Sequence, residues 1–508
     1  MSARIQASRA PVHLGILAEL TSAGTLPLAV VSAAGITLGF FAWLMLVVPR
    51  HDALLSNVGL LVSVVLTTGV VLFAWDGYAK YFSRRTGITF ARSLQYDAIS
   101  WAPFLLLWLS FVLSPNFTRG GSTVFAIALA LFGIAKVLVA ARFNQTVREV
   151  LIDFVATRTA VIVIAELAAV IIGQRAGTHV QESSNLLLNV WGRWDAVHYL
   201  DIATQGYQGT DMAFFPLFPL MIRILGGLIG NHLVAGILIA NGSFFFALLY
   251  LYKLLEHEYD RSVARRAIFY VSIFPTALFF SAVYTESLFF MLTVASFYYM
   301  RAHRWWLAGI IGFFASMSRV EGVLLVVPFV IEWYAQHRNN LSDRRGWMDL
   351  LPAAVIPLGL VLYSAYLWVL RADPLYFSHV QIHWNRHFAP PWVSVINAFA
   401  KIAHATQAQT IANQTLEIVF TALMIGVLLG GWRQLRPSYI AYMALSILIP
   451  MSTSSLMSMP RFALVLFPMF AILARWGERP AVNNLIVALS LPLLGLFTVL
   501  YADWYWVA

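Results

Sequence analysis

The sequence contains no cysteine among its 508 residues, and only 11% of its residues are charged. Without cysteine, disulfides, thiolate catalysis and cysteine-ligated metals are excluded. A composition with 60% hydrophobic residues and a mean hydropathy of +0.76 is typical of polytopic membrane proteins rather than soluble ones. The apolar runs lack the two-residue alternation of barrel strands, so we expect an all-α membrane protein.

Acidic residues are also scarce, with 23 Asp and Glu against 33 Lys and Arg, which gives a net charge of +10. No soluble segment interleaves basic and aromatic residues, so the charge does not indicate nucleic-acid binding. In a membrane protein, an excess of Lys and Arg is expected in the cytoplasmic loops.

Apolar runs long enough to form membrane helices recur along the whole chain. They predict about 15 transmembrane helices. The expected spans are 26–48, 56–75, 99–114, 122–141, 156–174, 232–252, 267–281, 285–300, 306–318, 320–335, 350–370, 416–432, 438–450, 461–474 and 483–501.

Basic residues gather in alternate loops, which the positive-inside rule places in the cytoplasm together with the N-terminus. The first span, 26–48, is too long for the apolar part of a signal peptide. The alternation requires that 214–229, which contains four prolines and glycines, is a re-entrant or surface-lying helix rather than a full span. Segments 175–231 and 371–415 then face outward. The basic residues used are Lys80, Arg84, Arg85, Arg92, Arg142, Arg148, Arg158, Lys253, Arg261, Arg265, Arg266, Arg301, Arg304, Arg338, Arg344, Arg345, Arg433, Arg436, Arg475 and Arg479.

The first outward segment carries acids among aromatic residues, in "GRWDAVHYLDIA". In a helix, Asp195, His198 and Tyr199 share one side because they are three and four residues apart. An acid that is partly desolvated beside a histidine suits a general base. The alternative is structural: Asp195 caps the helix and His198 is a hydrogen-bonded interfacial residue. For Asp201 and Asp211 we favour the structural interpretation.

The following stretch, "AFFPLFPLMIR", is rich in aromatic residues and proline and includes Phe215 and Pro216. It predicts the wall of a groove for a lipid chain. It also suits a membrane-surface anchor in which Arg223 extends to the headgroups.

Four charged residues lie at the ends of apolar runs: Glu286 in "VYTES", Arg319 and Glu321 in "SRVEG", and Arg461 in "MPRF". Charges at the membrane edge indicate function. Glu286, Arg319 and Glu321 could instead pair for structure alone. Arg461 has the donor geometry for a phosphate, with extension to the headgroups as the alternative.

Three histidines, His379, His383 and His387, are spaced four residues apart and would share a helical face. Three histidines can bind zinc, but no acid accompanies them in the pattern, and contacts to a phosphate or sugar are the alternative. No cofactor or metal site is firmly predicted, and a divalent metal stays open. Phosphate-binding glycine loops, G-x-S-x-G elbows and H-E-x-x-H motifs do not occur, so cytosolic nucleotide chemistry is unsupported.

Five ordered motifs carry a family resemblance: "RWDAVHYLDIATQGY", "AFFPLFPLMIRIL", "SAVYTESLFF", "SRVEG" and "MPRFALVLFPMF". From about Phe154 to the C-terminus the chain resembles the PIG-V-type family, which adds the second mannose in GPI-anchor synthesis, and its bacterial relatives. The resemblance implies a GT-C-like glycosyltransferase core, 151–508, with a polyprenyl-phosphate sugar donor and inversion at the anomeric carbon. Residues 1–150 form an additional block of about four transmembrane helices before this core.

The resemblance also implies the role of Asp195, and the other site residues are given roles from their chemistry. Asp195 matches the essential acid of the first long outer loop and takes the proton of the acceptor hydroxyl. Arg461, together with Arg319 or His383, neutralises the departing phosphate. Arg193 and His198 orient Asp195 or the acceptor, and aromatic residues stack on the sugars. The remaining candidate substrate contacts are Tyr199, Phe215, Pro216, Glu286 and His387.

The predicted activity is a mannosyltransferase that acts on a glycolipid or another glycan acceptor at the outer membrane face. The membrane is the plasma membrane in a bacterium and the endoplasmic reticulum membrane in a eukaryote. One alternative is a related transferase for another sugar, because the motifs do not distinguish epimers. The other is a lipid or sugar transporter, which should have interrupted helices in two related halves, and we do not find them.

Overall fold

A computed structural model describes residues 77–96 except 85, residue 98, and residues 121–172, 180–339, 341–342 and 344–507. Within these ranges every regular element is a helix, and the pairing of Phe388 with Thr453 is an isolated β-bridge. This agrees with the expected all-α class. The predicted spans 26–48, 56–75 and 99–114 lie outside the described residues.

The chain divides into two compact units, Met1–Gln145 with Gly227–Asn231, and Thr146–Gly226 with His232–Ala508. In the first unit, α5 (Gly121–Phe143) covers the predicted span 122–141. The roles assigned from sequence to 1–150 and 151–508 remain predictions.

Five helical segments in the described residues are long and apolar enough to cross a membrane. Helices of 23 to 27 residues are about 35–40 Å long at 1.5 Å per residue, which exceeds the ~30 Å hydrocarbon core. The segments are Gln145–Ile171 (α6), His232–Glu258 (α10), Gly346–Arg371, Ala408–Gln434 and Pro480–Ala502 (α23).

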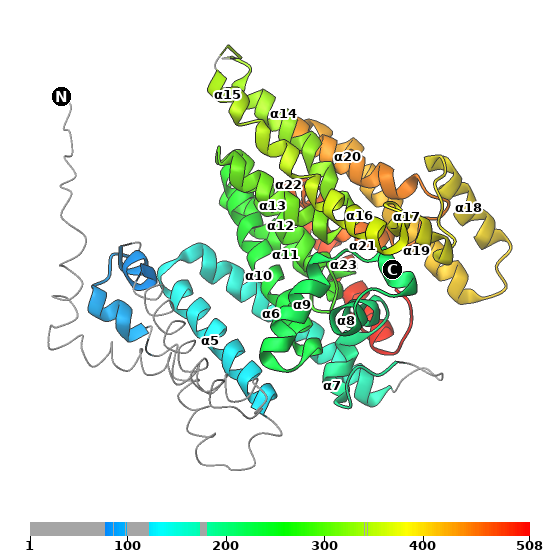
Figure 1. The fold of residues 1–508 in the computed structure, drawn as a ribbon, viewed down its shortest axis with the longest axis horizontal. Coiled ribbons are helices and arrows are strands. Elements are labelled where there is room, and N and C mark those ends of the chain that lie inside the picture. The colour runs from blue at the N-terminus through cyan, green and yellow to red at the C-terminus, as the bar shows by residue number, and fades with distance from the viewer. Residues whose placement is uncertain are drawn as a thin grey trace. The chain divides into compact units, whose positions relative to one another are not determined.

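Shorter helices fill the second unit between these segments (Figure 1). Here α12 packs against both α10 and α13, and α11 packs against α22 and α23. The bounds are α7 Leu186–Asn189, η2 Val190–Gly192, α8 Asp195–Gln205, η3 Gly209–Ala213, α9 Leu217–Ile229, α11 Arg261–Ile273, η4 Ala277–Phe280, α12 Glu286–Arg301, α13 Trp305–Ser318, η5 Val320–Leu325, α14 Val326–His337, α15 Arg344–Met348, η6 Leu351–Val355, α16 Leu358–Arg371, α17 Tyr376–His379, η7 Val380–Trp384, α18 Pro391–Ala403, α19 Ala408–Gly431, η8 Trp432–Gln434, α20 Pro437–Met451, α21 Met459–Leu464 and α22 Phe467–Trp476.

Helix α9 is the segment that the charge pattern required not to be a full span. It has 13 residues and is therefore about 20 Å long, shorter than the hydrocarbon core. Helices α13 and α20 are of similar length, so the re-entrant or surface-lying placement of α9 stays a prediction.

Several predicted spans are interrupted in the structure. The span 267–281 is wrong, because α11 ends at Ile273 before Pro275, and η4 follows. The span 461–474 is divided into α21 and α22 ahead of Pro468. The span 320–335 begins as η5 before α14 continues it.

Arg158 was wrongly assigned to a cytoplasmic loop. It lies inside α6 and is 2% exposed. Its guanidinium donates to the carbonyls of Ala277 and Ser272, each at 2.7 Å, and lies 4.8 Å from the Phe244 ring centre. Helix α6 begins 11 residues before the predicted span, so Arg158 lies well inside it. The hydrogen bonds of Arg158 join this helix to α11 and η4.

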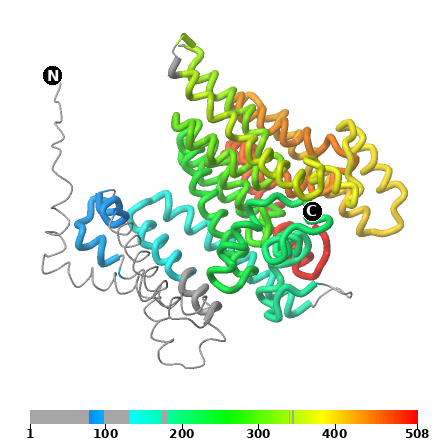
Figure 2. The backbone as a smooth tube through the Cα atoms, viewed as in Figure 1, coloured from blue at the N-terminus to red at the C-terminus, as the bar shows by residue number. Residues whose placement is uncertain are grey.

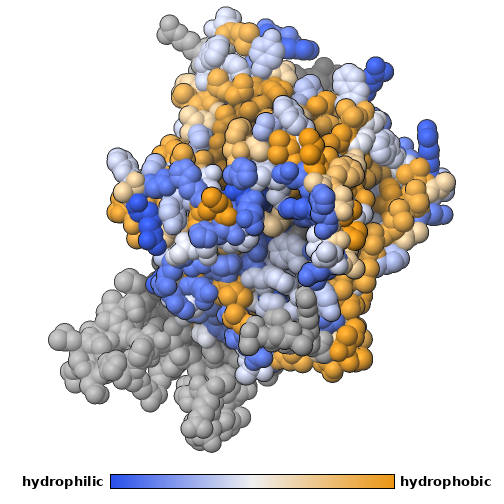
Figure 3. Space-filling view, turned by 90° about the vertical axis from the view of Figure 1, so that its right-hand side faces the viewer, coloured by the Kyte–Doolittle hydropathy of each residue, from blue (hydrophilic) through white to orange (hydrophobic). Residues whose placement is uncertain are grey.

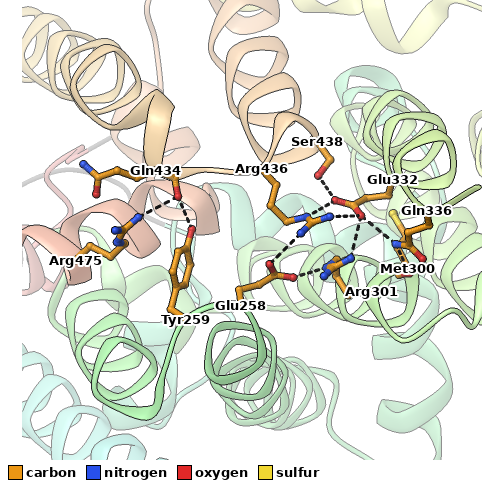
Figure 4. A network of polar contacts seen from close by, with 10 residues as sticks. All are labelled: Glu258, Tyr259, Met300, Arg301, Glu332, Gln336, Gln434, Arg436, Ser438 and Arg475. Carbon is orange, nitrogen blue, oxygen red and sulfur yellow. Dashed lines mark hydrogen bonds and ion pairs between the residues drawn. The ribbon is translucent and has the colours of Figure 1, made fainter. Parts of the chain in front are cut away.

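A buried ion network joins the last turn of α12 to α14 and α20 (Figure 4). Glu332 is 1% exposed and accepts hydrogen bonds from Arg436 at 2.8 Å and Ser438 at 2.6 Å. Arg301 pairs with both Glu332 and Glu258. A buried carboxylate needs such partners, so this network fixes the packing of these helix ends.

Candidate active site at the start of α8

The start of α8 is held by side chains from elsewhere in the fold. Trp194 has φ +56°, an unfavourable left-handed conformation for a tryptophan that costs about 1–3 kcal/mol. Its ring packs against Trp504 and Trp506, at centroid distances of 5.6 and 5.4 Å. Figure 2 shows the C-terminal segment beside α8. This packing maintains the turn that aims Asp195.

Hydrogen bonds from Tyr284 also hold this turn in place. Its hydroxyl donates to the Arg193 carbonyl at 3.1 Å and accepts from the Asp195 amide at 3.2 Å. The amide of Val283 donates to the carbonyl of Trp191 at 3.0 Å. The "VYTES" turn therefore positions the backbone of the "GRWDAVHYL" segment.

The Asp195 side chain begins a chain of alternating charges. Its Oδ2 lies 2.6 Å from Arg461 Nη1, and Arg461 Nη2 lies 2.6 Å from Glu286 Oε1. The same Oε1 accepts from Arg319 Nη1 at 3.1 Å, and Arg319 Nε lies 3.5 Å from Glu321 Oε2. We call these five residues, from four separate segments of the sequence, the outer ion chain.

The outer ion chain is most buried in its middle, and Asp195 is its most exposed member. The exposed fraction of the side chain is 23% for Asp195 and 7% for Arg461, and Glu286 is fully buried. Arg461 also lies over the ring of Tyr284, 4.8 Å from its centroid. Asp195 is thus the accessible end of a buried, paired network. The alternatives of an Asp195 helix cap and an Arg461 that extends to the headgroups are both wrong in this structure.

Beside Asp195 lies a second pair, His198 and Asp211. His198 Nδ1 lies 2.8 Å from Asp211 Oδ1. Burial lowers the pKa of His198, but the hydrogen bond to Asp211 and the charges of Asp195, Asp211 and Asp201 outweigh it, so the pKa is raised. With Nδ1 bound to the carboxylate, Nε2 is the nitrogen left for another partner.

Aromatic rings surround His198. Phe214 stacks on it at a centroid distance of 4.6 Å, and Trp384 meets it edge-on at 6.2 Å. Trp384 belongs to η7, in the second segment that is predicted to face outward. The two segments with this prediction therefore meet here, and half-buried aromatic rings surround His198.

Tyr199 and Phe215 have mainly packing contacts. The Tyr199 hydroxyl lies 3.3 Å from Thr285 Oγ1. Phe215 packs in a buried cluster with Tyr363, whose hydroxyl donates to the carbonyl of Met212 at 2.8 Å. Pro216 is half-buried directly before α9. The Tyr363 hydroxyl also lies 3.1 Å from the carbonyl oxygen of Phe214, so this cluster supports the ring that stacks on His198.

The structure does not bring Arg193 to the accessible part of the site. Its side chain is fully buried, donates to the carbonyl of Tyr501 at 3.4 Å and lies over the Trp504 ring. Its contribution to the site is its backbone carbonyl, which Tyr284 holds.

The three histidines do not share a helical face, contrary to the prediction. Asn385, with φ +53°, ends η7 before His387 is reached. His379 pairs with Asp373 at 2.7 Å, an acid that the pattern did not indicate, while His383 is exposed. No group of metal-binding side chains of the kind that would hold an ion occurs in the part of the chain that the structure describes.

Sequence reasoning missed three residues of the site: Tyr284, Trp384 and Arg386. Arg386 is half-buried, and the charges of Glu321 and Glu417 act on it. Tyr284 and Trp384 stand within motifs that were singled out, but a motif does not show which of its aromatic residues faces a distant helix.

The arrangement suits a polar substrate that carries negative charge. Hydrophilic side chains gather across the face on the right-hand side of Figure 1, where α8 and α17 lie, with hydrophobic side chains beside them (Figure 3). A carboxylate at an accessible end can accept a proton. Guanidinium groups next to it can bind a phosphate, and the rings can stack on a sugar.

Residues 133–343 match the model of the mannosyltransferase (PIG-V) family. This range includes Asp195, His198, Glu286 and Arg319, but not Arg461. A search of curated proteins gave no match. With the candidate membrane spans, the family match supports a membrane mannosyltransferase, and hence a glycosyltransferase.

Proposed function

Because residues 133–343 match the mannosyltransferase (PIG-V) family, we propose that this chain transfers mannose from a polyprenyl-phosphate-mannose donor to a glycolipid or glycan acceptor. The reaction inverts the anomeric carbon, on the outer membrane face and in a GT-C-like fold. One observation carries the proposal: the accessible carboxylate of Asp195 at the end of the outer ion chain.

In the reaction, the acceptor oxygen forms a bond to the anomeric carbon as the bond from that carbon to the phosphate oxygen breaks. Asp195 takes the proton of the acceptor hydroxyl. The departing polyprenyl phosphate gains negative charge, which Arg461 stabilises from its position beside Asp195. Asp195 and Arg461 pair with each other in this structure, so donor binding exchanges one anionic partner of Arg461 for another.

The neighbouring residues have supporting roles. Glu286 Oε1 accepts hydrogen bonds from both Nε and Nη2 of Arg461 and so fixes the orientation of the guanidinium. Arg386 supplies a further cation near the outer ion chain. His198, stacked on Phe214 and held by Asp211, orients the sugar of donor or acceptor.

The test measures sugar transfer by the purified full chain with radiolabelled polyprenyl-phosphate mannose and a membrane glycolipid extract. Asp195→Asn should lower turnover roughly 10²- to 10⁴-fold while donor binding persists, because loss of a general base affects the chemical step. The matched control is Asp201→Asn on the same helix, which should transfer at the wild-type rate.

Equal transfer by wild type and Asp195→Asn would show that Asp195 is not the base. Transfer from other polyprenyl-phosphate sugars but not from the mannose donor would overturn the sugar assignment and leave the site intact. Loss of wild-type activity on chelation would show a metal requirement.

A further inference from the structure

A cavity of about 540 Å³ lies away from the outer ion chain, between the second half of α10 and the last turn of α12. Cavities of this size hold small molecules and headgroups. A smaller cavity of about 390 Å³ adjoins it, and both are lined by Lys253, Tyr298 and Ala302. The reaction proposed above uses none of these residues.

The lining changes from apolar to cationic along α10. Phe246, Tyr250 and Lys253 are spaced four and three residues apart and therefore share one face of the helix. Phe246 is half exposed, at 51%. From Phe246 to Lys253 the helix rises about 10 Å, which is comparable to the distance from the upper acyl chains of a phospholipid to its headgroup. This order of polarity matches that of a lipid in one leaflet.

Tyrosines form the middle of the lining. The hydroxyls of Tyr250 and Tyr299 lie 3.2 Å apart, and the rings of Tyr250 and Tyr298 are 5.7 Å apart. Tyrosine concentrates at the membrane–water interface because its ring is apolar and its hydroxyl is polar. The tyrosines at this cavity are thus the residue type that is typical of headgroup depth.

Two cations, Lys253 and Arg304, lie at the polar end of the lining. Within the described part of the chain, the side chains of Lys253 and Arg304 form no ion pair, whereas Arg301 beside them pairs with Glu258 and Glu332. Glu256 and His257 line only the smaller cavity. The positive charge at the larger cavity is thus available to an anion.

We propose that this cavity binds the headgroup of an acidic phospholipid, with the phosphate between Lys253 and Arg304 and an acyl chain along Phe246. Basic pockets between membrane helices on the cytoplasmic side bind anionic headgroups in this way. The positive-inside pattern places this end of α10 and α12 on that side. The bound lipid stabilises the helix pair that carries Glu286 at its other end.

Native mass spectrometry of the purified full chain tests the proposal, with phosphatidylglycerol and phosphatidylcholine of identical acyl chains as probes. The wild type should retain phosphatidylglycerol in preference. The double variant Lys253→Gln/Arg304→Gln should lower its occupancy on the order of tenfold, since each cation near a membrane surface contributes to anionic lipid binding. Thermal unfolding of each variant checks that it is folded.

The matched control is Arg338→Gln/Arg479→Gln, which removes two exposed cations of the same charge set outside the cavity. It should bind phosphatidylglycerol as the wild type does. An equal loss in both double variants would mean general charge attraction and would overturn the proposal. So would equal retention of the two lipids by the wild type.

Two additional measurements keep the proposal testable if the double variant does not fold. Phosphatidylglycerol with a photoreactive acyl chain should crosslink in the wild type to peptides that contain residues 246–253 or 298–304, and labelling elsewhere would contradict the site. Glycerol 3-phosphate should compete only weakly, and displacement as effective as that by the lipid would assign the cavity to a free phosphate compound instead.

Discussion

At the scale of single residues, Glu286 holds two arginines with one carboxylate. Its Oε1 lies within 3.1 Å of both Arg461 and Arg319, in fully buried surroundings. Glu286→Gln would leave these cations without their shared charge, which typically costs about 3–5 kcal/mol when an ion pair is buried. We expect a clearly lower unfolding midpoint in detergent and strongly reduced transfer.

The control for this variant is Glu478→Gln. Glu478 also pairs with an arginine, Arg266, but its side chain is 55% exposed. Exposed pairs contribute only about 0–1 kcal/mol, so the midpoint should barely change. Similar midpoints for the two variants would show that the outer ion chain does not stabilise the fold.

His198 predicts a pH dependence at the same scale. Its pKa in the folded protein is raised, so protonation favours folding. This contribution is complete below the unfolded pKa of about 6.5 and is lost as the pH rises through the folded value. Asp211→Asn removes the acceptor that raises the pKa, so the difference in melting temperature from wild type should be greatest near pH 6 and shrink towards pH 8.

The pair of His379 and Asp373 provides the control for the pH series. The His379 side chain is 63% exposed, so Asp373→Asn should have little effect on the melting temperature at either pH. A difference between wild type and Asp211→Asn that stays constant with pH would mean that His198 does not titrate with folding.

At the scale of elements, the sequence predicts helices better where nothing interrupts the apolar run. The expected spans 232–252, 285–300 and 306–318 correspond to α10, α12 and α13 within a few residues. The breaks at Pro275 and before Pro468 are not predicted, because a hydropathy average along the chain does not register an interruption as short as a single turn. The pairing of Asp195 with Arg461 joins residues 266 positions apart, and no periodicity carries that information.

The "SRVEG" turn gives a prediction about a single element. A Cβ on Gly322 would lie 2.3 Å from the backbone of Ala315 and Ser316. Gly322→Ala must therefore push η5 away from α13 and displace Arg319 and Glu321, which flank the break. We expect loss of both stability and transfer, measured by thermal unfolding and by the mannose assay.

Gly242→Ala is the matched control, because nothing lies within 4 Å of a Cβ at this position inside α10. Alanine stabilises a helix interior by about 0.5–1 kcal/mol relative to glycine. The control should be as stable as the wild type or slightly more stable. If Gly322→Ala is also as stable as the wild type, the turn can shift enough to accept the added methyl group despite its close packing.

At the scale of the whole second unit, two buried ion networks lie at opposite ends of α12. Glu286 begins this helix and Arg301 ends it, so they are about 22 Å apart along the helix axis. The first network has an accessible carboxylate beside half-buried aromatic rings. The second, around Glu332, joins helix ends and has none of the outer site's residues (Figure 4). Both networks consist of buried ion pairs, but the first presents a carboxylate to a substrate, whereas the second holds helix ends together.

Glu332→Gln is expected to lower the stability of the fold without lowering the turnover of folded molecules. The variant removes one of the two carboxylates that Arg301 and Arg436 share, and Glu258 remains as the other. Because Glu332 is buried, the loss of its charge should lower stability by about 3–5 kcal/mol. Because the outer ion chain is intact, turnover per folded molecule and the KM for the donor should match the wild type. Asp195→Asn should do the reverse and keep its unfolding midpoint within a few degrees. If Glu332→Gln lowers the turnover of the folded fraction as far as Asp195→Asn does, the two networks are coupled through α12, and the site depends on the opposite end of the helix for its geometry.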